Sequence, residues 1–285
     1  MRIIDCQIHV WAADRPDRPW PKAGVDGRNA VPNRPVPLGY EEVIREMDAA
    51  GVHGAVLVPP SWEGDYNDLV IEAAGKYPDR FASTGRILCD DPDGPARIAR
   101  WTEQPGLRGV RVLFEPGSGW PEAGVDHWLW SAAERAGVVV TLATRRYFDL
   151  IGQIAERHPG LRFSIDHFGT DWHKTDAATF EQLPAVLGLA RLPNVAVKAS
   201  MIAALSSQPY PYANIHGFVR QAYDAFGPRR FFWGSNITRL TGPYRESVNL
   251  FLEDFAAWIG PQDLEWVMGR AVCDWIGWRA PFTAA

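Results

Sequence analysis

Two histidines and an arginine stand out in this sequence because each interrupts or ends an apolar run. His9 and His167 each follow a short segment rich in apolar residues, and Arg111 lies inside the apolar segment 109–114. Imidazoles can move protons near neutral pH, although a histidine in such a place can also be a purely structural hydrogen-bonding group. An arginine in an apolar strand must find a buried partner or a ligand anion. These residue types therefore predict proton transfer and anion binding.

Short apolar runs alternate with helical patterns along the whole chain. In segment 40–50, Val43, Ile44 and Met47 share one helical face, and Gly51 follows where a helix C-cap glycine belongs. Eight such alternations predict parallel strands, because parallel neighbours need crossover connections. The expected strands are 1–9, 52–59, 80–87, 107–114, 137–143, 161–167, 194–200 and 230–234, and the expected helices are 40–50, 68–76, 95–104, 126–136, 148–158, 180–190, 216–226, 244–259 and 262–276.

Eight parallel strands are the number at which a sheet closes around a filled interior. We therefore predict a single α/β domain over residues 1–285, a (β/α)8 TIM barrel with an extra C-terminal helix. An open doubly wound sheet is the alternative, but it usually carries a glycine-rich phosphate loop after its first strand. Here that place reads His9-Val10-Trp11.

Segment 12–38 does not follow the alternation, because it is rich in proline and arginine and has no periodicity. A loop of this length without secondary structure is usually functional or disordered. After the first strand of a barrel it would lie at the C-terminal face, where active sites are built. We predict a lid or pocket wall.

Polar residues at the C-terminal ends of barrel strands are candidates for catalysis or binding. Asp5, Gln7 and His9 alternate along the first strand, so they are expected to point to one side. Asp5 and Asp166 could instead orient neighbouring side chains. Further binding candidates near strand ends are Trp11, Ser61, Asn67, Arg86, Thr141 and Arg239.

Several motifs resemble the amidohydrolase superfamily, and within it the branch of the 2-pyrone-4,6-dicarboxylate lactonase and the sugar lactonases. The opening segment 4–11 resembles the superfamily signature Ile-Asp-x-His-x-His-x-Trp. The strand-one and strand-eight motifs are fairly specific, and the others are weak singly. The resembling segments are Ile4-Asp5-Cys6-Gln7-Ile8-His9-Val10-Trp11, Gly109-Val110-Arg111, Ile165-Asp166-His167-Phe168-Gly169, Val195-Ala196-Val197-Lys198-Ala199-Ser200, Phe232-Trp233-Gly234-Ser235-Asn236 and Val267-Met268-Gly269.

The chain departs from this pattern at three places. Gln7 replaces the first histidine of the signature, and Asn236 replaces the acidic residue that normally ends strand eight. The family's metal-binding histidine on strand five has no counterpart, because Thr141-Leu142-Ala143-Thr144 contains none. A catalytic divalent metal generally needs three or more anionic or imidazole ligands. Since only His9 and His167 remain obvious, we expect no metal and no other cofactor.

The resemblance to the metal-independent lactonases implies a mechanism. The acidic residue at position 236 would take a proton from water, His9 and His167 would polarise the carbonyl, and Gln7 would donate a further hydrogen bond. Arg111, with Arg86 or Arg239, would hold a substrate carboxylate. A neutral amide cannot take that proton, so Asn236 indicates either a natural non-hydrolytic relative or an engineered Asp-to-Asn change that traps substrate. The intact remaining constellation favours the engineered change.

The predicted activity is thus hydrolysis of a lactone or related carbonyl compound carrying a carboxylate. The alternatives are metal-dependent decarboxylation of an aromatic acid, which bound divalent metal would favour, and a non-catalytic binding relative. A net charge of −5 without a basic run argues against a nucleic-acid partner. Three widely spaced cysteines, no signal-peptide pattern and no membrane-length apolar run predict a cytoplasmic protein with reduced, buried thiols. The oligomeric state stays open, a homo-oligomer included.

Overall fold

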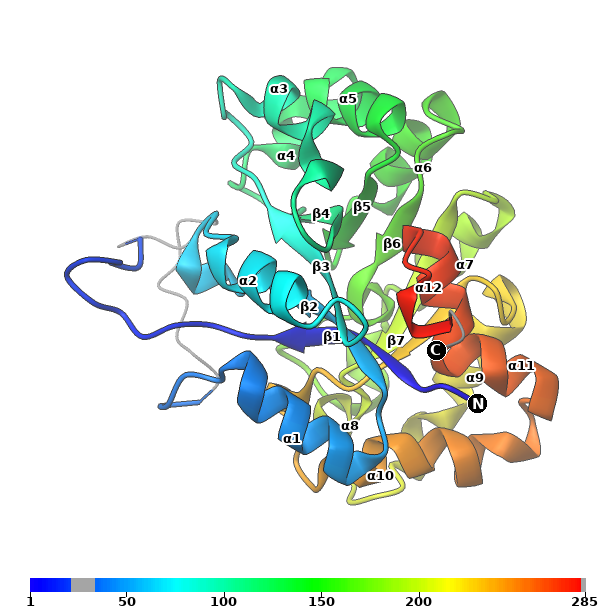
Figure 1. The fold of residues 1–285 in the computed structure, drawn as a ribbon. Coiled ribbons are helices and arrows are strands. Elements are labelled where there is room, and N and C mark those ends of the chain that lie inside the picture. Colours follow the sequence, from blue (N-terminus) through cyan, green and yellow to red (C-terminus); the bar gives the residue numbers. More distant parts are fainter. Residues whose placement is uncertain (22–33, 283–285) are drawn as a thin grey trace.

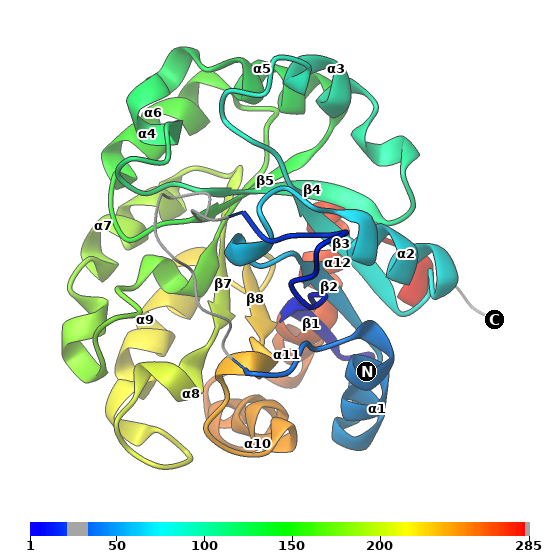
Figure 2. The ribbon, with the colours of Figure 1, turned by 90° about the vertical axis from the view of Figure 1, so that its left-hand side faces the viewer.

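The structure is a computed structural model that describes residues 1–21 and 34–282. In these residues eight parallel strands form one sheet in the order β1 to β8, and helices form a ring around them (Figures 1 and 2). The predicted (β/α)8 barrel is confirmed. Its strands are β1 (Ile4–His9), β2 (Gly54–Val58), β3 (Phe81–Arg86), β4 (Leu107–Leu113), β5 (Val139–Ala143), β6 (Phe163–Ile165), β7 (Val195–Ser200) and β8 (Phe231–Gly234).

The helices follow the strands in chain order, with short 3₁₀ and π turns between them. They are α1 (Tyr40–Ala50), α2 (Asp68–Lys76), α3 (Gly94–Ala99), α4 (Trp120–Ala123), α5 (Trp128–Ala136), α6 (Phe148–Arg157), α7 (Leu183–Gly188), α8 (Ile202–Leu205), α9 (His216–Phe226), α10 (Tyr244–Asn249), α11 (Pro261–Glu265) and α12 (Ala271–Ile276).

Two long helices expected near the C-terminus are interrupted. A π turn (Leu250–Asp254) and a 3₁₀ turn (Phe255–Ala257) follow α10 directly, and a π segment (Trp266–Arg270) separates α11 from α12. The second break has a packing reason: a Cβ on Gly269 would lie 2.7 Å from the carbonyl oxygen of Arg2. The chain thus bends where it passes the start of β1.

Asp5 joins the last strand to the first. Its carboxylate accepts hydrogen bonds from the Ser235 amide at 3.0 Å and from the Tyr244 hydroxyl at 2.7 Å. Gly234 permits this close approach, because a Cβ there would lie 2.7 Å from Cys6 Sγ. The register of β1 also shifts between Asp5 and Ile8. Asp5 Oδ1 also accepts a hydrogen bond from the Gln7 backbone amide at 2.9 Å, so Asp5 has the orienting role that the sequence left open.

The described flanks of segment 12–38 pack against the connection between β2 and α2. The Ala12 amide donates to Glu63 Oε1 at 2.9 Å, and Arg18 pairs with Glu63 at 2.5 Å and Asp68 at 2.7 Å. Figure 1 places this part of the chain beyond the C-terminal end of β1, as expected for a pocket wall. Residues 22–33 of the predicted lid lie outside the described residues, so the lid stays a prediction.

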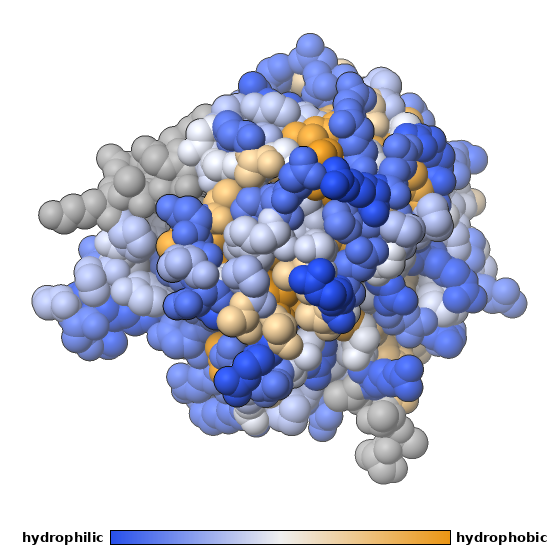
Figure 3. Space-filling view, turned by 90° about the horizontal axis from the view of Figure 1, so that it is seen from above, coloured by the Kyte–Doolittle hydropathy of each residue, from blue (hydrophilic) through white to orange (hydrophobic). Residues whose placement is uncertain are grey.

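On the face seen in Figure 3, hydrophilic residues predominate and hydrophobic ones form small areas. In the described parts of the chain, no helix is long and apolar enough to cross a membrane. All three cysteines are free thiols; Cys6 and Cys273 are buried as expected, whereas Cys89 is only partly buried.

Candidate active site

Gln7, His9 and Lys198 form a directed hydrogen-bond chain across the barrel. The Lys198 ammonium donates to Gln7 Oε1 at 2.9 Å, which turns the Gln7 amide nitrogen toward His9 Nε2 at 3.5 Å. His9 Nδ1 lies 2.8 Å from the Val58 carbonyl oxygen. Because a carbonyl only accepts, Nδ1 carries the proton and Nε2 carries the lone pair. His9 is thus held as one neutral tautomer.

Asp166 anchors two buried cations. Its Oδ2 accepts a hydrogen bond from Arg111 Nε at 2.6 Å, and its Oδ1 forms an ion pair with the Lys198 ammonium at 3.0 Å. All three side chains are buried, Asp166 fully. Although burial alone would raise it, the pKa of Asp166 is held well below its usual range by the Lys198 and Arg111 charges. Arg111 keeps both terminal nitrogens without a partner among the described residues, so that edge can bind a carboxylate.

His167 sits on a tight turn just after β6. The predicted strand 161–167 ends early, at Ile165, and His167 takes a left-handed conformation with φ of 52°. Its Nδ1 lies 2.8 Å from the Ser200 hydroxyl. Burial first, and then the charges of Arg111, Lys198 and Arg239, lower its pKa to about 4 despite the opposing charge of Asp166. His167 is therefore neutral at neutral pH.

The pKa of His9 is lowered further, to about 3, by burial first and then by the charge of Arg111. Two buried imidazoles that stay neutral make the folded state sensitive to acid. In the unfolded chain both protonate near pH 6.5, whereas in the folded protein they do so only near pH 3 and 4. Their contribution to stability is therefore present above pH 6.5 and is lost as the pH falls toward 4.

We expect His167→Asn to reduce the acid dependence of stability. One such histidine changes the free energy of unfolding by about 1.4 kcal/mol per pH unit between its two pKa values. Burial raises the pKa of Asp5 to about 6, so this residue changes the free energy of unfolding in the opposite direction over part of the range. The quantity to compare is therefore the difference in pH slope between the wild type and His167→Asn. Urea denaturation at pH 4.5, 5.25 and 6 measures it, with exposed His173→Asn as the control. An unchanged pH slope in His167→Asn would contradict the buried neutral imidazole.

Asn236 follows β8 in a left-handed conformation, with φ of 50°, which asparagine and aspartate tolerate better than most residues. Its backbone amide donates to the Gln7 backbone carbonyl at 3.0 Å, so position 236 lies beside β1. The Asn236 side chain is buried, and its Oδ1 accepts from Thr238 Oγ1 at 3.5 Å. Arg239 is more exposed, and its charge contributes to the lowered pKa of His167.

Aromatic rings form a wall next to His9. Trp11 is buried and packs edge-on against Trp62 with ring centroids 5.3 Å apart, and Trp62 lies 6.5 Å from His9. Ser61 begins the short 3₁₀ turn that carries Trp62. These rings cover one side of His9.

Two predicted binding residues make hydrogen bonds within the protein. The Asn67 amide group pairs with the Arg86 backbone, accepting from its nitrogen at 2.7 Å and donating to its oxygen at 2.9 Å. Thr141 Oγ1 lies 2.8 Å from the Ser164 hydroxyl inside the barrel. Arg86 is buried at the end of β3. The binding roles of all three stay predictions.

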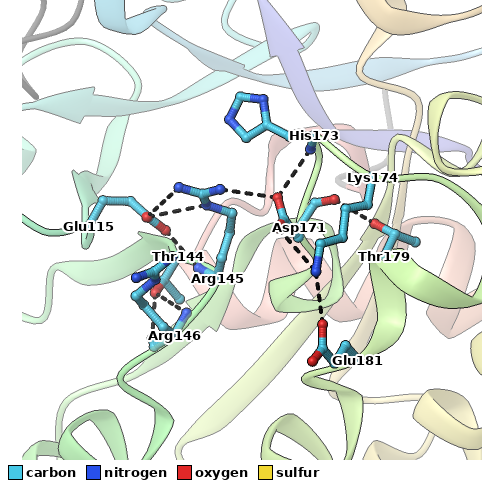
Figure 4. Close-up of polar contacts among 9 residues, drawn as sticks. All are labelled: Glu115, Thr144, Arg145, Arg146, Asp171, His173, Lys174, Thr179 and Glu181. Carbon is cyan, nitrogen blue, oxygen red and sulfur yellow. Dashed lines mark hydrogen bonds and ion pairs between the residues drawn. The ribbon is translucent and has the colours of Figure 1, made fainter.

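An ion-pair network braces the loops that follow β4, β5 and β6 (Figure 4). Arg145 lies between Glu115, at 3.0 Å, and Asp171, at 3.1 Å. Lys174 extends the network from Asp171 to Glu181. Beside it lies a hollow of about 340 Å³, lined in part by Arg145 and Lys174. Because its three carboxylates and two cations pair with one another, the network serves to hold these loops.

The donor atoms of the site do not suit the divalent metal that the superfamily resemblance implies. Among residues 1–21 and 34–282, no three His, Cys, Asp or Glu side chains are grouped to hold a metal ion. Asp166 Oδ1 is buried without a hydrogen bond, but the Lys198 ammonium lies 3.0 Å from it. Two like unit charges 4 Å apart repel by roughly 4 kcal/mol at an effective dielectric of about 20. A divalent ion at that distance from the Lys198 ammonium would be repelled about twice as strongly, so the ammonium opposes a metal at Asp166.

Comparison with known proteins agrees with this architecture. The Amidohydrolase family model matches residues 4–271. The chain belongs to the Amidohydrolase family. The L-fucono-1,5-lactonase of Burkholderia ambifaria is 25% identical over 279 residues, covering 90% of this chain and 85% of the relative. The 4-sulfomuconolactone hydrolase of Hydrogenophaga intermedia is 26% identical over 201 residues, 69% of this chain and 64% of the relative.

Solved structures share the fold of this amidohydrolase. An amidohydrolase of Burkholderia multivorans with bound zinc superposes with a TM-score of 0.75 at 20% identity, covering 98% of this chain and 100% of the other. A probable 2-pyrone-4,6-dicarboxylic acid hydrolase of Acinetobacter baumannii, with citric acid bound, gives 0.71 at 19%, covering 97% and 100%. The family predicted from the motifs is confirmed.

The structure of this amidohydrolase adds residues that the predicted site left out. The sequence suggested only an orienting role for Asp166, and Lys198 and Ser200 lay within a resembling segment without a role. The three residues are the direct partners of Arg111, Gln7 and His167. Lys198 carried the same signal as Arg111, a cation inside an apolar strand that must find a buried partner. The same argument could therefore have placed Lys198 in the predicted site.

Proposed function

We propose that this amidohydrolase hydrolyses a lactone, or a related carbonyl compound, that carries a carboxylate, and that it does so without a metal. The observation that carries the proposal is the pair of buried neutral imidazoles, His9 and His167, beside the open edge of Arg111. The lactone-hydrolysing relatives support the reaction class. The Lys198 ammonium beside Asp166 supports the absence of a metal from the reaction.

The hydrogen bonds suggest a different part for each histidine. His167 would polarise the carbonyl by donating from Nε2, in the tautomer whose Nδ1 accepts a hydrogen bond from the Ser200 hydroxyl. His9 presents a lone pair at Nε2, so it would accept a proton instead of donating one. Its pKa of about 3 makes it a weak base at neutral pH.

Position 236 sets the rate in this proposal. The Asn236 amide can accept a hydrogen bond from water but cannot take its proton. We therefore propose that hydrolysis by this chain is slow, and that an aspartate at this position would act as the general base. This role does not depend on whether the asparagine is natural or engineered.

A panel of lactones tests the proposal, with sugar 1,5-lactones, muconolactones and pyrone dicarboxylates assayed by proton release. We expect hydrolysis of at least one carboxylate-bearing lactone, faster in Asn236→Asp, and no loss after dialysis against a chelator. Elemental analysis of the same samples should find less than stoichiometric zinc or manganese. Near one equivalent of metal, lost together with activity on chelation, would contradict the metal-free mechanism and favour the metal-dependent alternative.

Arg111→Lys should weaken ligand binding while it preserves the charge opposite Asp166. Lysine keeps a cation but loses the second edge of the guanidinium, which is the part proposed to bind the carboxylate. Loss of one partner of a desolvated carboxylate costs about 2–5 kcal/mol, so the Kd should rise by tens-fold or more. Calorimetric titration with a carboxylate-bearing lactone measures it, with Arg108→Lys on the same strand as the control. Normal affinity in Arg111→Lys would assign the carboxylate to Arg86 or Arg239.

A further inference from the structure

Lys198 places a positive charge between oxygen atoms that come from opposite sides of the site. Its ammonium lies 2.9 Å from Gln7 Oε1 on β1 and 3.0 Å from Asp166 Oδ1 at the end of β6. The residue is only 3% exposed, so its ammonium is withdrawn from solvent. Carboxylate and amide oxygens with imidazole nitrogens nearby are also ligands that a divalent cation takes.

We propose that the Lys198 ammonium is the resident cation of this site and occupies the place that a metal ion would otherwise take. An ammonium is a compact point charge with three N–H donors, so it can hold two oxygen ligands and neutralise a carboxylate as a metal would. The positive charge of Lys198 explains why Asp166 remains ionised beside the neutral imidazoles of His9 and His167. The inference rests on the proposed function for its catalytic consequence alone.

Lys198 acts as a positioning residue in this arrangement. By donating to Gln7 Oε1 it turns the Gln7 amide nitrogen toward His9, and by pairing with Asp166 it shares the carboxylate that also holds Arg111. Its charge also helps to lower the pKa of His167. Removal of the charge should therefore change both the cation preference of the site and the titration of His167.

Zinc uptake by four proteins tests the inference: the wild type, Gln7→His, Lys198→Ala and the double variant. The Gln7→His change adds an imidazole beside His9, Asp166 and His167, which gives enough ligands for zinc. We expect the double variant to bind one equivalent in equilibrium dialysis, at least about 100-fold more tightly than Gln7→His alone, since only the latter retains the repelling ammonium. Equal affinity of these two proteins, or no zinc in the folded double variant, would overturn the proposal.

Lys198→Met and Lys198→Arg provide a second measurement if the alanine variants fail to fold. In ¹⁵N-histidine NMR, Lys198→Met should raise the pKa of His167 above the wild-type value, because one of the charges that lower it is removed, whereas Lys198→Arg should leave it near the wild-type value. The control is Lys174→Met. Like Lys198, Lys174 pairs with carboxylates, here Asp171 and Glu181, but it is exposed. An unchanged His167 titration in Lys198→Met would overturn the proposal. Neither readout uses a lactone, so a failure to find hydrolysis leaves this test intact.

Discussion

Asn236→Asp is expected to raise the rate of lactone hydrolysis by about 10²–10⁴-fold, the usual contribution of a positioned general base. The two side chains are nearly isosteric, and both tolerate the left-handed backbone at this position. The hydrogen bond from the position 236 amide to the Gln7 carbonyl is unaffected by the change. Burial at position 236 would raise the pKa of the new carboxylate, and the charge of the neighbouring Arg239 would act in the opposite direction.

The measurement is kcat/KM for Asn236→Asp and the wild type on a ligand already shown to bind the wild type. The rate of Asn236→Asp should fall at acid pH as the new carboxylate protonates. Asn249→Asp, which adds the same charge at the end of α10, serves as the control and should gain nothing. If a bound ligand with a hydrolysable lactone is left intact by Asn236→Asp, the general-base assignment is wrong.

Asp166→Asn is expected to lower the free energy of unfolding by about 3–5 kcal/mol, the cost of breaking a buried ion pair from one side. The change leaves Arg111 and Lys198 without their shared negative charge, although both are buried in the barrel. An amide can still accept a hydrogen bond, so the predicted loss is mainly electrostatic.

Urea denaturation at pH 7 measures this loss for Asp166→Asn and for a matched variant, Asp171→Asn. Asp171 also contacts two cations, Arg145 and Lys174, but it lies nearer the surface, so its loss should cost about 1 kcal/mol or less. Equal destabilisation by both changes would show that burial does not distinguish the two carboxylates.

The architecture followed from periodicity in the sequence. Apolar strand runs alternate with amphipathic helices, and parallel strands with crossover helices leave few arrangements open, so the order β1 to β8 could be predicted. The same argument assigned Gln7, His9, Arg111 and Asn236 to one end of the barrel, since the C-terminal ends of parallel strands lie together. Residue type then identified Arg111 as a cation that needed a partner.

Only the tertiary structure decided which partner each polar group has. Arg111 and Asp166 are 55 residues apart, and Lys198 and Gln7 are 191 apart, so no local pattern links them. The tautomer of His9 depends on the Val58 carbonyl of the neighbouring strand, and the aim of His167 depends on a left-handed turn that cut β6 short. Strand order can be read from local periodicity, whereas the pairing of buried charges depends on side-chain geometry across the barrel, because each buried ion must be matched in three dimensions.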